Sequence, residues 1–301
     1  AASDVYKRQN HDSAERLSFA SRILRGTGLF LCGDLYHTLA PVILKDDDGE
    51  VAFAPLPYAE PGKVREALST DVHTHEEAER ALSDFLLRQM GHAARKIAIA
   101  HEFVAGGSAS DSERPLSIGG TDLISADIFA PYNYTALGHL HGPQQAGGKE
   151  NVRYSGSLLK YSFSEAAQKK GVIVGEIDGA GQVGTKFTSL APRHEVRAIK
   201  GFFDDLIKGE SEDFLMAELL DEGPVIDAMA RLRQKYPRMM TIQSHRRMNS
   251  GSGERSFDLM KKVDPLDMFR VFYKEFQDKE FTEEEENYMK ELWENLRKED
   301  D

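Results

Sequence analysis

The sequence predicts an α/β protein with a layered domain, a smaller α/β unit and a helical tail. Two short apolar runs, 96–100 and 134–138, each lead directly into a histidine, as buried strands do when their carboxyl ends carry a ligand site. Between residues 194 and 247 the pattern reads strand, helix, strand, helix, strand. Two segments with apolar residues at helical spacing follow a polar stretch that contains Gly and Ser.

Length and composition agree with more than one domain. The chain has 301 residues, of which 40% are hydrophobic, and this suffices for one sizeable core and a second, smaller unit. The segments that we expect are 1–9 as a foreign or misjoined stretch, 10–192 as the layered domain, 193–247 as the small α/β unit, 248–263 as a linker and 264–301 as the tail.

Charge and cysteine content limit the function classes. The net charge of −12 argues against a protein that holds nucleic acid through its overall field. The tail from Asp264 carries 14 acidic and 6 basic residues, so the remainder can still present a basic patch. The sequence shows neither a membrane-spanning run nor a secretion signal, and the one cysteine, Cys32, is expected to be a buried strand thiol. We therefore expect a cytoplasmic protein without membrane contact.

Local patterns predict the elements of the layered domain. Asp12 and Glu15 form a capping box before one helix, and Thr74 and Glu77 can cap another. A turn at 46–49 joins two of the strands. We expect helices at 12–24 and 75–94 and strands at 28–31, 41–44, 51–54, 96–100, 134–138, 171–177 and 183–187.

Histidines at strand ends form the first part of a candidate site. His101 follows one buried run, and His139 follows the other, with His141 two residues further on. Alternate residues of an extended chain point the same way, so His139 and His141 can face one site, while Gly138 allows a close approach of backbone and metal. Three imidazoles suit Mn, Fe or Zn better than a calcium or magnesium cage made only of oxygens.

The run Asn10-His11-Asp12 forms the second part, because it precedes a capped helix whose amino end favours phosphate. The amide oxygen of Asn10 can ligate a metal, while His11 meets a leaving group or a phosphoryl oxygen. Two metal ions about 3.5–4 Å apart can activate water and neutralise charge during phosphodiester hydrolysis. The pattern thus favours metal-dependent phosphoester chemistry.

These motifs resemble those of the calcineurin-like metallophosphoesterases. Residues 10–13 resemble the end of the Gly-Asn-His-Asp motif of that superfamily, and residues 138–141 resemble its last metal motif. The run 152–165, followed by the small α/β unit and the tail, is similar to the SbcD family of nuclease subunits, bacterial relatives of the double-strand-break repair nuclease. This similarity covers the chain from Asn10 onward.

The resemblance implies a DNA exonuclease and endonuclease of repair, recombination and replication that opens hairpins and blocked ends. It implies two Mn ions, with Mg, Fe or Zn as alternatives. One ion would be held by Asn10, His101 and His139 and the other by His141, with His11 as the catalytic histidine. Two earlier motifs of the family, Asp-x-His and Gly-Asp-x-x-Asp, do not precede Asn10, and Gln9 replaces the glycine. We therefore expect the first strands to be missing and this chain to be inactive alone.

The resemblance also implies partners. The first partner is the SbcC ATPase, which is the subunit that uses ATP. The others are double-stranded or hairpin DNA and a second copy of this chain, with which it would form a homodimer within a heterotetramer. The helix at 12–24 would then form part of a homodimer face, with internal core as the alternative. The tail would grip the coiled coil of SbcC, with packing against its own body as the alternative. The partner-binding residues would be Phe269, Phe272, Phe276, Leu292 and Trp293.

Two other functions stay open. The chain could be another enzyme of the superfamily, a phosphatase or a cyclic-nucleotide phosphodiesterase. This function would not explain why the chain has the small α/β unit and the tail. Alternatively, the chain could be a non-catalytic docking subunit for SbcC that has lost metal ligands and retains the function of its tail helices. Several polar residues outside these motifs are expected to be structural, with Asp34 in a turn and His73 and His75 solvated beside a helix cap. The histidines without a partner motif are His37, His194 and His245.

Overall fold

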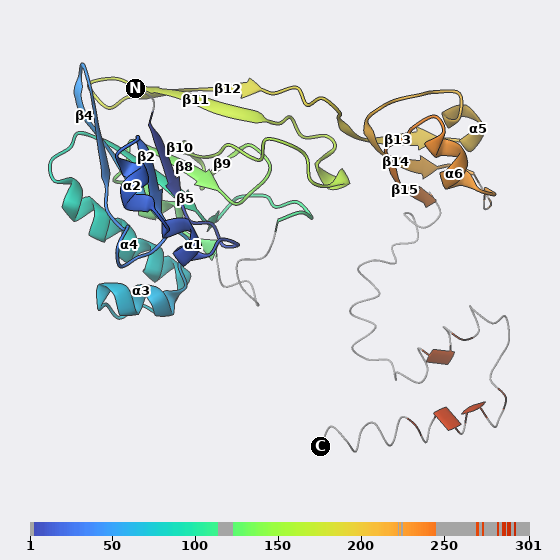
Figure 1. Ribbon diagram of the computed structural model, residues 1–301, viewed down its shortest axis with the longest axis horizontal. Helices are drawn as coiled ribbons and strands as arrows, with labels where there is room; N and C mark the ends of the chain where they lie inside the picture. Colours follow the sequence, from blue (N-terminus) through green and yellow to red (C-terminus); the bar gives the residue numbers. More distant parts are fainter. Residues whose placement is uncertain are drawn as a thin grey trace. The chain divides into compact units, whose positions relative to one another are not determined.

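The computed structural model describes residues 3–113, 123–221, 223, 225–244, 269–270, 273, 282, 285–286, 288–289 and 292. The chain divides into two compact units (Figure 1). The first consists of Ala1–Ala198, Ser211–Met216 and Arg238–Met240, and the second consists of Ile199–Glu210, Ala217–Pro237 and Thr241–Asp301. Within the described ranges, no helix combines the length and the apolar character that crossing a membrane requires.

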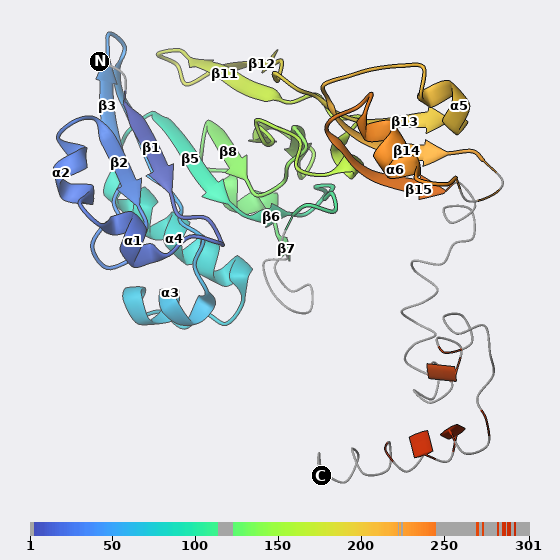
Figure 2. The same cartoon turned by 45° about the vertical axis from the view of Figure 1, so that its right-hand side comes forward.

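The first unit is built on a six-stranded mixed sheet (Figure 2). Its strands, in spatial order, are β3 (Val42–Asp46), β4 (Gly49–Pro55), β5 (Arg95–His101), β8 (Tyr134–Gly138), β10 (Lys149–Tyr154) and β9 (Gln144–Ala146). The four central strands run parallel to one another, whereas β3 and β9 are antiparallel edge strands. The parallel register pairs His101 with Gly138, so the ends of β5 and β8 meet at one edge. This confirms the α/β prediction and the two predicted strands that end in histidine.

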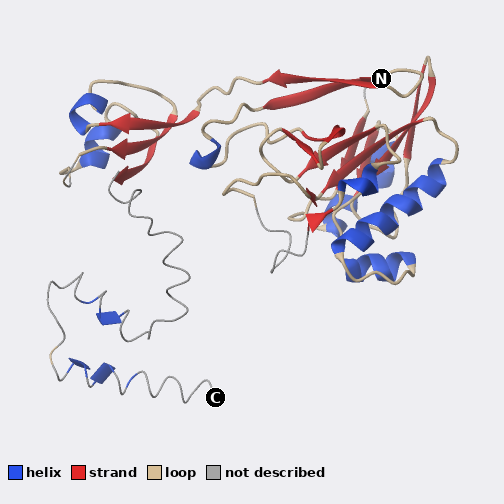
Figure 3. Cartoon of the chain, turned by 180° about the vertical axis from the view of Figure 1, so that it is seen from behind, coloured by secondary structure: helices blue, strands red, loops and turns tan. Residues whose placement is uncertain are grey.

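Helices α3 (Pro61–Leu68) and α4 (His75–Met90) form a layer beside these strands (Figure 3). The predicted cap of α4 is confirmed, because Thr74 accepts from the amide of Glu77 while the Glu77 carboxylate accepts from the amide of Thr74. The helix ends at Met90 and not at 94, since Gly91 follows with a φ of 57°. Helix α3 was not predicted, although proline at its first position is a common start signal.

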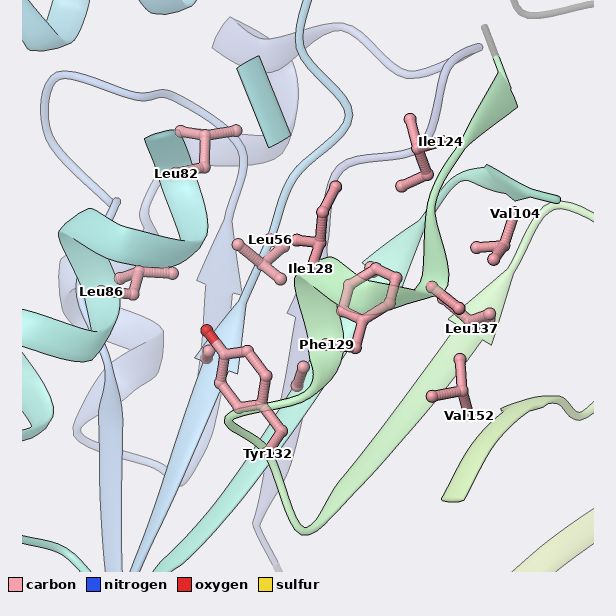
Figure 4. Packing of buried hydrophobic residues seen from close by; sticks show 14 of the residues in the cluster. Leu56, Leu82, Leu86, Val104, Ile124, Ile128, Phe129, Tyr132, Leu137 and Val152 are labelled. Atoms are coloured by element: carbon pink, nitrogen blue, oxygen red, sulfur yellow. The ribbon is translucent and has the colours of Figure 1, made fainter. Parts of the chain in front are cut away.

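The core of the first unit lies between α4 and the sheet (Figure 4). Leu82 and Leu86 of α4 are almost fully buried and belong to one cluster with Leu56, Phe129 and Tyr132. Each such side chain stabilises the fold by about 1.5–3 kcal/mol relative to an exposed one. Cys32 belongs to the same core, and burial raises the pKa of its thiol to about 12. The prediction of a buried strand thiol is therefore confirmed.

Smaller elements complete the first unit. The predicted hairpin of β11 (Gly171–Ile177) and β12 (Val183–Ser189) is confirmed as an antiparallel pair. Strands β6 (Phe103–Val104) and β7 (Leu123–Ile124) pair in parallel, and short 3-10 helices cover Ala126–Phe129 and Phe163–Glu165. Strand β2 (Leu29–Cys32) corresponds to the strand predicted at 28–31.

The amino-terminal segment forms a strand. Strand β1 (Asp4–Lys7) pairs in parallel with β2 and contacts β4 and β5, although its sequence shows no apolar period. The pairing places Lys7 beside the sheet edge where β5 and β8 end. The origin of residues 1–9 as a foreign stretch stays a prediction, because strand formation does not test it.

The single helix predicted at 12–24 is wrong. The segment forms two short helices, α1 (Ala14–Ser18) and α2 (Ser21–Arg25), because Ala20 adopts a left-handed φ of 58° between them. The predicted cap is also wrong, since the Asp12 carboxylate accepts from the amide of Gln9 and the hydroxyl of Tyr6. Ser13 caps α1 instead and accepts from the amide of Arg16.

The small α/β unit follows the predicted order. It consists of β13 (Val196–Gly201), α5 (Phe203–Leu206), β14 (Phe214–Leu219), α6 (Ala228–Arg233) and β15 (Met239–Ser244), with the strands adjacent in that order. Its buried side chains include Phe203 and Leu232, and the guanidinium of Arg231 lies 4.3 Å from the Phe203 ring centroid.

In the tail, the predicted capping box is confirmed. Thr282 donates its amide to the Glu285 carboxylate over 2.8 Å, and its hydroxyl accepts from the Glu285 amide over 3.3 Å. The predicted linker 248–263 and four residues of the sequence-based expectations lie outside the described residues: His245, Phe272, Phe276 and Trp293.

Candidate active site

The five predicted site residues of the layered domain line one pocket of about 980 Å³. Asn10 and His11 follow β1, His101 ends β5, and His139 and His141 follow β8. Three segments that are far apart in the sequence therefore converge at the carboxyl edge of the parallel strands, as the strand-end pattern predicts. The lining also includes Ser112, Glu113, Ser157, Leu158 and Tyr161.

His101 is the most buried histidine of this pocket, with 5% of its surface exposed. Burial lowers its pKa to about 2, and the positive charge of Lys7 and the neighbouring histidines act in the same direction. The Lys7 ammonium lies 3.2 Å from Nδ1, and the Asn10 side-chain oxygen lies 3.1 Å from Nε2. An ammonium only donates, so Nδ1 accepts, and Nε2–H donates to Asn10.

Gly138 is required by the approach of these groups. A Cβ at this position would lie 2.9 Å from Nδ1 of His101 and 3.3 Å from the Lys7 ammonium. From the sequence, glycine is expected here to allow the approach of a metal. In the structure the groups that approach Gly138 closely are the His101 ring and the Lys7 ammonium. His139, the next residue, has a φ of 104°, a conformation that non-glycine residues rarely adopt outside constrained sites. Its ring meets that of His101 edge-on at 5.4 Å.

Lys7 contacts the pocket residue His101, and the sequence does not predict this contact. Burial lowers the pKa of its ammonium to about 8, while the carboxylates of Glu102, Asp12 and Glu79 oppose that shift. Glu79 is itself buried, which raises the pKa of its carboxyl to about 8 despite the attraction of Lys7. Burial therefore disfavours the charged forms of both Lys7 and Glu79, and their mutual attraction offsets only part of this cost.

His141 has a separate set of polar neighbours. Its Nδ1 lies 3.1 Å from Oε1 of Glu165 and 2.8 Å from Oγ of Ser112. Burial alone would raise the pKa of Glu165, but hydrogen bonds from Lys170, Ser112 and His141 lower it to about 2. The sequence reasoning missed this group, although Glu165 belongs to the run 152–165 that resembles the SbcD family.

His11 lies at the mouth of the pocket. Its side chain is 49% exposed, its ring meets that of His101 edge-on at 6.1 Å, and its Nδ1 lies 3.5 Å from the Asp12 carboxylate. The helix expected beside it is α1, which has only five residues, and Ser13 already accepts from the amide of Arg16 in its first turn.

The residues expected to be structural lie away from the pocket. His73 forms an ion pair with Asp71 at 2.9 Å, and the ring of His75 stacks on that of Tyr58. Asp34 accepts from the amide of Tyr36 in a turn, as predicted. Two other described histidines have neighbours that their sequence context did not indicate, since His37 pairs with Asp34 and His194 meets Phe214 edge-on.

The donor types suit a transition metal, but their arrangement does not form a complete metal site. The described part of the chain contains no group of three or more His, Cys, Asp or Glu side chains that could hold a metal ion. Both ring nitrogens of His101 are already engaged, one by Lys7 and the other by Asn10. The pocket thus holds only part of a donor set. This part consists of the imidazoles of His139 and His141 and the amide oxygen of Asn10, and no carboxylate of the described residues lies at their centre.

The fold and the pocket define an α/β protein with histidines gathered at the carboxyl edge of a parallel sheet. Residues 192–276 match the SbcD_C family, described as type 5 capsule protein repressor C-terminal domain. Over these residues the chain is similar to the SbcD family. The matched segment contains the small α/β unit and the beginning of the tail, and the pocket residues lie outside it.

Proposed function

We propose that this chain acts as the nuclease subunit of an SbcCD-type complex and that the histidine-lined pocket cleaves DNA phosphodiesters, including those of hairpins and blocked ends. The observation that carries the proposal is the convergence of Asn10, His11, His101, His139 and His141 in one pocket. The SbcD_C match at residues 192–276 supports the nuclease over a phosphatase or a cyclic-nucleotide phosphodiesterase, for which the small α/β unit and the tail have no known use. The proposed complex works in the cytoplasm with the SbcC ATPase.

The proposal assigns two Mn ions to the pocket, with Mg, Fe or Zn as alternatives. Asn10, His101 and His139 serve one ion and His141 serves the other, and further ligands come from motifs that this pocket does not contain. Bound ions of this kind supply an activated water and neutralise phosphoryl charge. His101 becomes available only when one of its ring nitrogens is released, either Nδ1 by Lys7 or Nε2 by Asn10. His11, at the mouth, meets the leaving group.

Manganese binding tests the assignment directly. We expect His139→Ala combined with His141→Ala to weaken Mn²⁺ binding at least about tenfold, because the double variant removes an imidazole from each ion. Isothermal titration of the 301-residue chain measures the effect, with His73→Ala, which lies outside the pocket, as the control. A parent chain that binds no Mn²⁺, or a double variant that binds as the parent does, would contradict the metal assignment.

A non-catalytic docking subunit for SbcC is the second candidate. The engagement of His101 by Lys7 favours it, since a buried ammonium beside an imidazole opposes a second cation there. Manganese-dependent cleavage of hairpin DNA by the chain together with SbcC separates the two functions. Cleavage supports the nuclease, whereas SbcC binding without cleavage supports the docking subunit.

The helical segment after Asn10 offers a homodimer face. Phe19 is 82% exposed and Ile23 is 76% exposed, so the alternative of internal core is wrong for these two side chains. Large apolar groups that are exposed close together are typical of an interaction surface. We propose that they contact the same segment of a second copy, whose isologous face would cover them.

Sedimentation at micromolar concentration measures this contact. We expect the parent to sediment as a dimer and Phe19→Asp with Ile23→Asp to sediment as a monomer, because two carboxylates would be buried in the interface without partners. Leu190→Asp is the control, since this exposed apolar side chain lies on another surface segment. A monomeric parent, or a dimeric double variant, would count against the dimer face.

A further inference from the structure

Glu165 lies behind His141 and is fully buried, whereas the ring of His141 lines the pocket. One carboxylate oxygen, Oε2, accepts from the Lys170 ammonium over 2.6 Å and from the Tyr161 amide over 3.3 Å. The other, Oε1, faces Nδ1 of His141 and accepts from the hydroxyl of Ser112. All four directions around this carboxylate are therefore occupied by polar groups.

Lys170 is held as firmly as its partner. Its side chain is 4% exposed, and its ammonium also donates to the carbonyl of His141, the hydroxyl of Ser157 and the side-chain oxygen of Gln168, over 2.7–2.8 Å. The ion pair thus anchors both the backbone of His141, through Lys170, and its ring, through Glu165. Neither charged side chain can turn away without leaving a buried charge unpaired.

The hydrogen atoms around His141 can be assigned by counting donors. A carboxylate that is paired with an ammonium has no hydrogen to give, so the hydrogen between Glu165 Oε1 and His141 belongs to Nδ1. The single hydroxyl hydrogen of Ser112 points to the same carboxylate oxygen, which leaves the Ser112 oxygen as a second acceptor near Nδ1. A neutral ring then carries its lone pair on Nε2.

We infer that Glu165, anchored by Lys170, is a positioning residue that holds the His141 ring in the Nδ1–H tautomer and directs the Nε2 lone pair into the pocket. A carboxylate behind a histidine is a common way to fix the ring and to raise its basicity as a ligand. The tautomer stands on the hydrogen bonds alone, whereas the use of Nε2 by a metal rests on the proposed function.

The amide variant Glu165→Gln reverses the donor count. Lys170 still requires an oxygen, so the amide oxygen is expected to face Lys170 and the amide NH₂ to face His141. Nδ1 must then accept, and the hydrogen moves to Nε2. Nitrogen-15 spectra of the histidine rings in the labelled 301-residue chain, recorded at neutral to mildly alkaline pH and assigned with His141→Gln, are expected to show exchange of the protonated and unprotonated nitrogens of His141.

Two further variants keep this test decisive. Glu113→Gln is the matched control, because Glu113 contacts His141 only through the backbone amide, over 2.7 Å, and should leave the tautomer unchanged. Ser112→Ala removes the other neighbour of Nδ1 and should also keep the Nδ1–H tautomer. This variant tests the inference even if Glu165→Gln does not fold. A parent with hydrogen on Nε2, a Glu165→Gln chain that keeps Nδ1–H, or a Ser112→Ala chain that loses it would overturn the inference.

Titration of the same samples with Mn²⁺ separates this inference from the proposed function. A parent with the expected tautomer but without Mn²⁺ binding would remove the metal role and leave the positioning role intact. A parent that binds Mn²⁺ with the opposite tautomer would remove the positioning role alone. Weaker Mn²⁺ binding in Glu165→Gln, by about 10–100-fold, together with the tautomer exchange, would support both.

Discussion

His11→Ala is expected to abolish DNA cleavage by this pocket while the bound manganese stays unchanged. The His11 ring lies in the pocket, 6.1 Å from that of His101, and is exposed enough to reach a substrate oxygen. A positioned acid or base contributes about 10²–10⁴-fold to rate, so a loss of at least 10²-fold is the expected size. No metal is assigned to His11, and the metal content should therefore be spared.

The measurement uses a chain that carries the Asp-x-His and Gly-Asp-x-x-Asp motifs, because the resemblance implies that these supply the remaining ligands. Initial rates on hairpin DNA and the metal content of the purified protein are recorded side by side. His73→Ala is the matched control, since His73 is paired with Asp71 outside the pocket. A His11→Ala protein that cuts at the parent rate would remove His11 from catalysis, and one that loses manganese would make it a ligand.

Phe272→Ala combined with Trp293→Ala is expected to weaken SbcC binding at least about a hundredfold, since buried aromatic anchors commonly contribute 2 kcal/mol or more each. Both residues lie outside the described part of the tail, and their helical spacing in the sequence places them on the same stripes as described neighbours. Phe269 and Leu292, on the same predicted stripes, are 37% and 38% exposed. Exposed side chains of this size favour a partner that covers them.

The described contacts within the tail refine this expectation. Arg270 pairs with Glu286, and the hydroxyl of Tyr273 donates to the Glu285 carboxylate over 3.0 Å, so the two helical segments contact each other. Glu285 and Glu286 are thereby engaged inside the tail, and the steering of a basic partner falls to the other acidic residues, with an association that weakens as salt rises.

Binding of SbcC to the full chain measures the effect across salt concentrations. Tyr288→Ala is the matched control, because Tyr288 is a 65% exposed aromatic residue of the same tail that does not belong to the predicted stripe. Its loss should change the affinity little. If the double variant binds SbcC as the parent does, or if it unfolds the layered domain, the tail helices are core and the partner assignment is wrong.

Local patterns in the sequence determined much of the fold and the position of the site. The runs into His101 and His139 are apolar segments of strand length, and their parallel pairing necessarily brings both histidines to one edge. The capping boxes at Thr74 and Thr282 involve residues three apart, so they are readable without tertiary contacts. The order of strands and helices in the small α/β unit is readable in the same way, because the spacing of its apolar residues changes between strand and helix periods.

Only the tertiary structure decided which groups surround the histidines. Lys7 reaches His101 across 94 residues, and Glu165 reaches His141 across 24. Neither pairing leaves a local pattern, because a buried charge requires a partner of opposite charge or a hydrogen bond, and any segment that the fold brings close can supply it. The break at Ala20 was not readable either, because its left-handed φ of 58° interrupts a segment whose apolar residues keep helical spacing. The histidines of the pocket were thus readable from the sequence, whereas the polar and charged groups beside each ring come from chain segments that meet only in the fold.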